Sequence, residues 1–117
     1  MPDNPFLTLE STTDWTDALT HSEDRQILVF KHSSTCSISA KAEREMRSLA
    51  EETNVPVYQV VVQENRAVSD EIADTLNVRH ESPQALLVDN GESVYDTSHL
   101  NVTEDTLRTE LHRTLAE

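Results

Sequence analysis

The sequence predicts an α/β protein in which helices cover both faces of a mixed four-stranded sheet. Segments with the three- and four-residue apolar spacing of helices alternate with short β-branched runs, a pattern typical of layered α/β folds. One run, Val57–Val62, is almost continuously apolar, as expected of a strand that is buried on both faces. Asn90-Gly91 between two apolar runs signals a two-residue hairpin, so the sheet should contain an antiparallel pair.

The first half of the chain is expected to contain two helices with a strand between them. Residues 1–11 show no periodic pattern, and we expect them to be loosely held. Apolar side chains at helical spacing predict a short helix over Thr13–Thr20 and a longer one over Ile38–Thr53. The compact apolar run Gln26–Phe30 predicts a buried strand between these helices.

The second half begins with the strand Val57–Val62, followed by a helix that Ser69 is expected to cap and that ends at Leu76. Because a helix joins the first two strands, they are expected to be parallel, with a right-handed crossover. The strands Ala85–Val88 and Ser93–Asp96 should form the antiparallel hairpin.

The last element is a helix that opens at Thr103, where acidic residues in the first turn suit the helix dipole. Its apolar stripe is expected to consist of Leu107, Leu111 and Leu115. No linker, repeat or low-complexity tract divides the sequence, so we expect residues 1–117 to form a single domain.

The charge balance limits the partners that the protein can have. Nine Lys and Arg residues stand against 22 Asp and Glu residues, for a net charge of −13, and such a field repels nucleic acids and acidic membrane surfaces. No apolar run approaches the roughly 20 residues of a membrane span, and the N-terminus lacks the pattern of a signal peptide. We therefore expect a cytoplasmic protein. Its acid-rich, lysine-poor composition suits a halophile or moderate halophile, although ordinary acidic proteins share it.

Cys36 is the one cysteine, so its sulfur chemistry requires a sulfur from another molecule. It lies between the first strand and the long helix, where unpaired backbone N–H groups favour an anion. A positive segment surrounds it, made by Lys31, Lys41, Arg44 and Arg47. We therefore expect the thiolate form to be favoured. The alternative is a small buried cysteine that packs as a hydrophobic residue, against which its polar neighbours argue.

Two motifs carry a resemblance to a known family. Cys36-Ser37-Ile38-Ser39 has the frame of a Cys-x-x-Cys redox motif, and Ser82-Pro83 directly precedes a strand. The blocks FKHSSTCSIS and VRHESPQ around them, together with NRAVS between them, resemble the monothiol bacilliredoxins, the YtxJ-type thioredoxin-like proteins of the bacillithiol system. The family usually reads T-C-P-I-S, and here Ser37 replaces the proline. The acidic surface is a second departure.

The resemblance implies a thioredoxin-like fold and thiol–disulfide exchange on proteins that carry a low-molecular-weight thiol. Cys36 would attack the mixed disulfide and retain the small thiol, which an external thiol then removes. The residues that would support Cys36 are Thr35, Ser37, Ser39, Ser82 and Pro83, with Ser39 placed to hydrogen-bond the thiolate. The co-substrate would be bacillithiol, whose malate carboxylates would meet charged groups among Lys31, His32, Lys41, Arg79, His80 and Glu81. No bound cofactor is implied.

Other functions remain open or are disfavoured by the sequence. A thioredoxin-like module that only binds proteins and a peroxide-sensing cysteine both remain alternatives. The five histidines lack metal-ligand spacing, so we expect no metal site. A single glycine, Gly91, cannot form a phosphate-binding loop, and a Cys36–His32 hydrolase would have little room for a substrate pocket in so small a domain.

Overall fold

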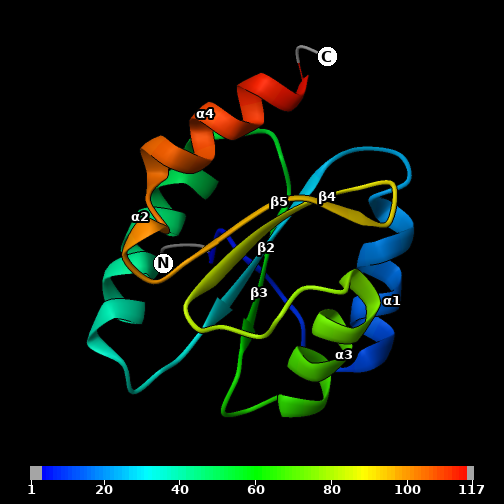
Figure 1. Cartoon of the computed structure of the whole chain (residues 1–117), viewed down its shortest axis with the longest axis horizontal. Coiled ribbons are helices and arrows are strands. Elements are labelled where there is room, and N and C mark those ends of the chain that lie inside the picture. The colour runs from blue at the N-terminus through cyan, green and yellow to red at the C-terminus, as the bar shows by residue number, and fades with distance from the viewer. Residues whose placement is uncertain (1–3, 116–117) are drawn as a thin grey trace.

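The computed structural model describes residues 4–115 as a five-stranded sheet between two pairs of helices (Figure 1). The strands are β1 (Leu7–Thr8), β2 (Ile27–His32), β3 (Val57–Val61), β4 (Gln84–Asp89) and β5 (Glu92–Ser98). The helices are α1 (Thr12–His21), α2 (Ser37–Glu52), α3 (Arg66–Leu76) and α4 (Glu104–Leu115), with a short 3-10 helix, η1 (His99–Asn101), before α4.

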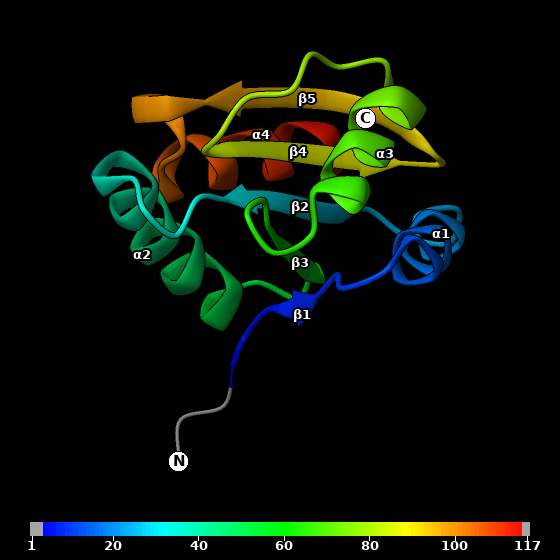
Figure 2. The same ribbon diagram turned by 90° about the horizontal axis from the view of Figure 1, so that it is seen from below.

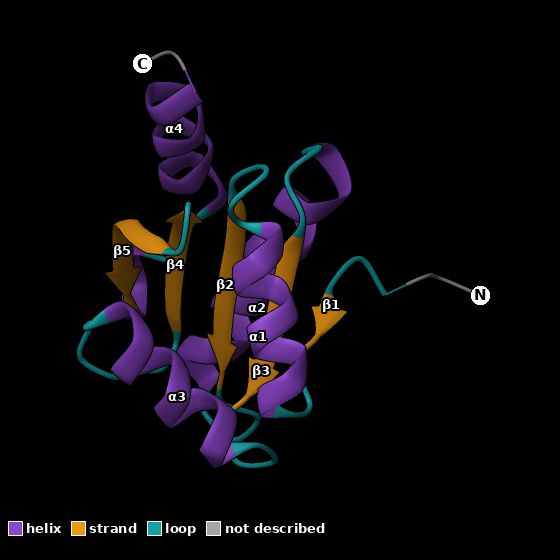
Figure 3. Cartoon of the chain, turned by 90° about the vertical axis from the view of Figure 1, so that its right-hand side faces the viewer, coloured by secondary structure: helices purple, strands orange, loops and turns teal. Residues whose placement is uncertain are grey.

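The sheet is mixed, and its strand order is β1-β3-β2-β4-β5 (Figures 2 and 3). The expected parallel pairing of the first two predicted strands is confirmed for β2 and β3, and β4 pairs antiparallel with both β2 and β5. The predicted hairpin joins β4 to β5 through Asn90 and Gly91, whose φ angles of 53° and 76° are those of a two-residue hairpin loop. The predicted α/β fold class is therefore confirmed.

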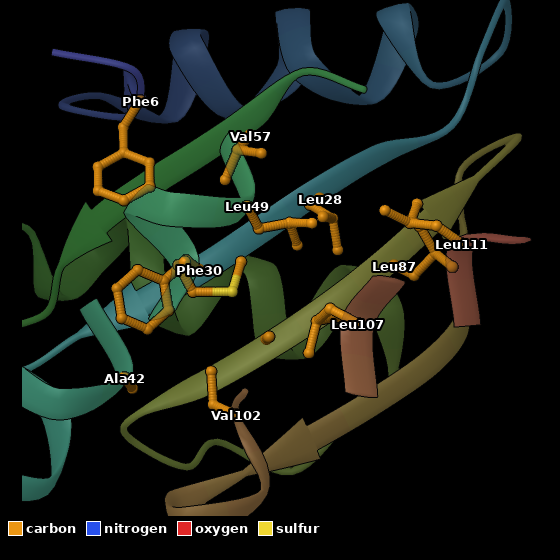
Figure 4. Close-up of a cluster of buried hydrophobic side chains, with 12 residues drawn as sticks. Phe6, Leu28, Phe30, Ala42, Leu49, Val57, Leu87, Val102, Leu107 and Leu111 are labelled. Atoms are coloured by element: carbon orange, nitrogen blue, oxygen red, sulfur yellow. The ribbon is translucent and has the colours of Figure 1, made fainter. Parts of the chain in front are cut away.

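Each face of the sheet has its own hydrophobic core. Along β2, Leu28 and Phe30 point toward α2 and α4, whereas Ile27 and Val29 point toward α1 and α3, and all four are fully buried. Figure 4 shows the first cluster, in which side chains of α2 and α4 meet those of the central strands. Because β2 is covered on both sides, its end is held in a fixed position, and this is where the Cys36 loop begins.

The N-terminal segment differs from our expectation. We expected residues 1–11 to be loosely held, but within the described part Phe6 and Leu9 are buried and Leu7–Thr8 forms a fifth strand, β1. The backbone N–H of Leu9 also donates to the carbonyl of Gln59, over 2.8 Å. The apolar alternation is too short to predict a strand from sequence, and β1 is stable because β3 offers it an open edge.

The predictions for the start of α3 and for the apolar stripe of α4 have different outcomes. Ser69 does not cap α3, which begins earlier, at Arg66 with Asn65 as its N-cap, so that Val68 is buried against the sheet. Ser69 is instead a buried residue inside the helix. In α4, Leu107 and Leu111 form the predicted apolar stripe, and the side chain of Leu115 lies outside the described residues.

None of the helices described within residues 4–115 has the length and apolar composition needed to cross a lipid bilayer.

The burial of β1 predicts unequal effects of two leucine substitutions. Leu9→Ala should lower the free energy of unfolding by about 2–5 kcal/mol, because Leu9 is 1% exposed and its removal leaves a cavity. Leu7→Ala is the matched control: its side chain is 49% exposed, and we expect a change below about 0.5 kcal/mol. Urea denaturation measures both, and equal small effects would mean that the segment is loosely held after all.

Candidate active site

Cys36 lies at the end of the loop between β2 and α2, as the sequence predicted. It is the N-cap residue of α2, with extended backbone angles (φ −106°, ψ 127°), and its side chain is partly exposed. The 16-residue helix has no acidic residue in its first turn, so no carboxylate of that turn competes for its unpaired N–H groups, which favour a nearby anion. Cys36 is therefore not the fully buried cysteine of the alternative interpretation.

Gln63 holds the loop that precedes Cys36, a role that we did not predict from the sequence. Its side-chain oxygen accepts the backbone N–H of Ser34 over 3.1 Å. Its side-chain nitrogen donates to the hydroxyls of Ser33 at 2.7 Å and Thr35 at 3.1 Å. One amide thus binds three consecutive residues of the loop. A polar residue just after β3 was the only signal available, and it does not distinguish Gln63 from ordinary loop residues.

Ser39 and His32 hold the loop from its other side. Ser39 is fully buried, and its Oγ accepts the backbone N–H of Ser33 over 2.8 Å and lies 2.9 Å from His32 Nδ1. Because the N–H of Ser33 is a donor, the Ser39 hydroxyl proton remains to donate to His32. We expected Ser39 to hydrogen-bond the thiolate, but in the structure its hydroxyl is engaged by His32 and Ser33. Burial lowers the pKa of His32, whereas Glu43 and a hydrogen bond with the Ser39 backbone oppose this shift.

Ser82-Pro83 lies at the same end of the sheet as Cys36. Gln84 is the cross-strand partner of Lys31, so the residues just before Gln84 lie beside those just after Lys31 (Figures 1 and 2). The Ser82-Pro83 peptide bond is cis, and Pro83 is buried. The carbonyl of Pro83 accepts the backbone N–H of His99 over 3.0 Å, which joins this segment to η1. The two sequence motifs therefore lie at the same end of the sheet, on either side of the β2–β4 pair.

Lys31 is placed differently from our expectation. Its side chain is fully buried, and its Nζ donates to the carbonyl of Ser69 at 3.1 Å and to His80 Nδ1 at 3.2 Å. The ammonium therefore does not face solvent, in contrast to the direct contact with a ligand that we expected. Burial lowers the pKa of Lys31 to about 8, although the nearby Asp70 carboxylate opposes the shift.

The other expected ligand-binding residues lie around the rim of the site. The Arg79 side chain is 92% exposed, and its Nε lies 3.8 Å from Glu81 Oε2. The other oxygen of the same carboxylate, Oε1, lies 3.7 Å from His99 Nε2. Lys41 is exposed on the second turn of α2, and Ser37 is exposed beside Cys36. Of these residues, Lys41 is an exposed cation on the helix that Cys36 caps, and Arg79 and Glu81 lie in the segment that leads to Ser82-Pro83.

Within residues 4–115, no group of three or more His, Cys, Asp or Glu side chains is arranged to hold a metal ion. A hollow lies between the C-terminal half of α2 and α4, where Leu49, Val55 and Arg108 contribute to its lining, at the other end of α2 from Cys36. Cys36 itself lies in a surface loop. This position suits a reaction with another protein better than enclosure of a small substrate.

Comparisons with known proteins agree with this geometry. A family model described as monothiol bacilliredoxin BrxC matches residues 7–107. A solved structure of a candidate oxidoreductase with a thioredoxin fold is 34% identical, with a TM-score of 0.81 over 88% of this chain and 90% of that chain. A thioredoxin from Trypanosoma brucei brucei is 20% identical, with a TM-score of 0.77 over 98% and 96% of the two chains. A variant thioredoxin from Halobacterium salinarum is 25% identical, with a TM-score of 0.72 over 97% and 94%. The fold is the thioredoxin fold.

The hydrogen bonds of Gln63 lead to a first prediction for the site. Gln63→Ala removes three bonds and should lower the free energy of unfolding by about 1–2 kcal/mol, because each such bond contributes modestly. Amide hydrogen exchange at Ser34 should become faster, because its N–H loses its acceptor. Glu64→Ala, at the next exposed position, is the control and should change neither quantity. An unaltered exchange rate at Ser34 in Gln63→Ala would contradict the assigned clamp.

The buried ammonium leads to a second prediction, for stability against pH. The folded-state pKa of Lys31, about 8, lies below its ordinary value of 10.5, so between these values the unfolded chain binds more protons. The contribution of Lys31 to stability should therefore rise with pH across this window. In urea denaturation, the stability of the wild type relative to Lys31→Met should increase by roughly 2–3 kcal/mol from pH 7 to pH 10. The same difference at both pH values would show that the ammonium is not buried in solution.

Proposed function

The chain belongs to the monothiol bacilliredoxin family, and from this premise we propose that it removes a low-molecular-weight thiol of the bacillithiol type from mixed disulfides on proteins. Family and fold make it a monothiol redox protein. The proposal of bacillithiol-type mixed disulfides as substrates rests on the position of the one thiol. Cys36 lies at the N-terminus of α2 and at the same end of the sheet as Ser82-Pro83.

The proposed reaction needs one sulfur from the protein and two from its substrate. The Cys36 thiolate attacks the small-thiol sulfur of the mixed disulfide, and the client protein leaves as a thiolate that takes a proton from water. One S–S bond breaks and one forms, so no external oxidant is needed. Cys36 now carries the small thiol, and a second thiol from solution attacks this disulfide and regenerates the enzyme.

The surface around Cys36 supports a protein as the substrate. Ile38, two residues beyond Cys36, is 36% exposed, and Leu100 in η1 is 64% exposed. The residue before Leu100, His99, is hydrogen-bonded to Pro83, and η1 packs against α2. Apolar side chains and a cis-proline segment therefore flank the sulfur. We propose that an extended client segment lies across this surface, with Ser82 and Pro83 orienting its disulfide.

The charges around the site support a small thiol with carboxylates. Lys41 and Arg79 are exposed cations in a protein of net charge −13, and they give an anion favourable charge on α2 and in the segment before Ser82-Pro83. Bacillithiol carries two carboxylates, which these residues would contact, with His80 and Glu81 beside Arg79. We place this activity in the cytoplasm, where free small thiols can regenerate Cys36 and no bound cofactor is needed.

Transfer of the small thiol tests the proposal. The protein is incubated with a peptide that carries a cysteine in mixed disulfide with bacillithiol, and intact-protein mass spectrometry follows Cys36. We expect the mass of the protein to rise by one bacillithiol, while Cys36→Ser gains none and leaves the peptide disulfide at its uncatalysed rate.

The same experiment separates the alternatives. A module that only binds proteins should bind the peptide equally well with Cys36→Ser and show no mass gain in either protein. A peroxide sensor should form a sulfenic acid with hydrogen peroxide faster than it takes up bacillithiol. Transfer of glutathione but not of bacillithiol would keep the exchange chemistry and reject the proposed small thiol.

A further inference from the structure

The buried ammonium of Lys31 has no role in the proposed exchange reaction, although burying a charge costs free energy. An ammonium placed away from water is stable only when its donors are satisfied. Lys31 is fully buried at the end of β2, and its Nζ donates to the Ser69 carbonyl at 3.1 Å and to His80 Nδ1 at 3.2 Å. The first partner lies in the rigid helix α3. The second lies in the segment 79–83, which ends in Ser82-Pro83 and contains no helix or strand before Gln84.

A second buried polar side chain holds the same segment. Gln84 is 1% exposed and is the direct cross-strand partner of Lys31, so the two side chains lie on the same face of the sheet. Its Nε2 donates to the carbonyl of Arg79 over 3.0 Å. Lys31 on β2 and Gln84 on β4 are therefore two buried polar side chains that bind consecutive residues of the segment. Lys31 binds His80, and Gln84 binds Arg79. Gln84 Oε1 has no partner among the described atoms, so this arrangement is kept at an energetic cost.

We propose that Lys31 is a positioning residue for thiol exchange, acting through His80 on the segment that carries Ser82-Pro83. Lys31 does not contact the reacting sulfur atoms. It holds the start of the segment to α3 and β2, so that the end of the segment presents Ser82 to a client beside Cys36. The inference rests on the proposed function, since a docking segment matters only if Cys36 reacts with an extended disulfide.

The link requires a particular protonation state of His80. An ammonium has only donors, so His80 Nδ1 must be unprotonated and the ring proton must lie on Nε2. The Ser69 hydroxyl, 3.2 Å from the same nitrogen, can also donate to it. Burial and the Lys31 charge lower the pKa of His80, as does Arg66 on α3, whereas Asp70 on α3 and Glu81 in the segment oppose the shift. Acid should therefore break the link by protonating His80.

Two reactions of the same thiol test the inference. Iodoacetamide alkylates Cys36 without docking, whereas the bacillithiol mixed disulfide of the peptide must lie against Ser82-Pro83. Lys31→Met should slow exchange with the peptide about tenfold and change alkylation less than about twofold, because a misplaced docking segment affects only the larger substrate. Equal slowing of both reactions would show that Lys31 acts on the sulfur itself, and no slowing would show a structural role only. Val88→Ala, at the far end of β4 on the same face, is the control for lost stability and should leave the ratio of the two rates unchanged.

A pair of His80 variants keeps the test independent of the folding of Lys31→Met. His80→Asn retains an acceptor near the position of Nδ1 and cannot be protonated there, whereas His80→Ala removes the acceptor. Both the exchange rate and the alkylation rate are proportional to the fraction of Cys36 that is thiolate, so their ratio does not depend on that fraction. In the wild type this ratio should fall as the pH drops below the ordinary histidine value of about 6.5. The ratio should be flat with pH in His80→Asn and low at every pH in His80→Ala. A pH-dependent ratio in His80→Asn would overturn the assigned link.

Amide hydrogen exchange separates this inference from the proposed function. In Lys31→Met, the amides of residues 79–82 should exchange faster, while those of β4 are unaffected. If the wild type transfers no bacillithiol but this loss of protection occurs, the proposed function fails and the anchoring role stands. If protection of residues 79–82 does not change, the inference is wrong whatever the enzyme transfers.

Discussion

The site depends on the two-residue period of β2 at its last two positions. Consecutive side chains of a strand point to opposite faces, so Lys31 faces α3 and His32 faces α2. His32 binds Ser39 and thereby ties the start of α2 to the strand. Lys31 binds His80 and ties the segment of Ser82-Pro83 to the same strand. Because β2 is covered on both faces, the sulfur and the docking segment are positioned from one rigid element, although they are far apart in sequence.

Periodicity predicted most of the architecture because the longer elements have clear apolar faces. The helix after Cys36, the parallel pair and the Asn90-Gly91 hairpin all follow from spacing and turn chemistry, which are local properties. β1 was missed since two residues carry no period. Gln63 and the contact between Lys31 and His80 were missed for a different reason: both are tertiary contacts between side chains, and a lysine or a glutamine is expected on the surface unless its partner is known.

Of the four cations near Cys36 in the sequence, only some present their charge to solvent in the structure. Lys31 directs its charge into the interior, and Arg47 pairs with Glu43 at 3.4 Å and lies 5.2 Å from the centre of the Phe6 ring. Lys41 and Arg44 remain exposed on α2. Attraction of an anion to the site therefore depends on few cations against a net charge of −13, and added salt screens both this attraction and the repulsion by the rest of the protein. Cys36 is also the N-cap residue of α2, and a helix N-terminus favours negative charge nearby.

The position of Ser39 agrees with the proposal that an external thiol resolves the adduct on Cys36. In a Cys-x-x-Cys motif the fourth residue supplies the second sulfur, and here that position is a buried hydroxyl bonded to Ser33 and His32. A hydroxyl is not an accessible nucleophile near neutral pH. Through its hydrogen bonds with Ser33 and His32, the Ser39 hydroxyl stabilises the loop that carries Cys36. The fourth residue of the motif therefore supports the loop and supplies no second thiol, so in the proposed reaction a small thiol on Cys36 would leave only when another thiol attacks it.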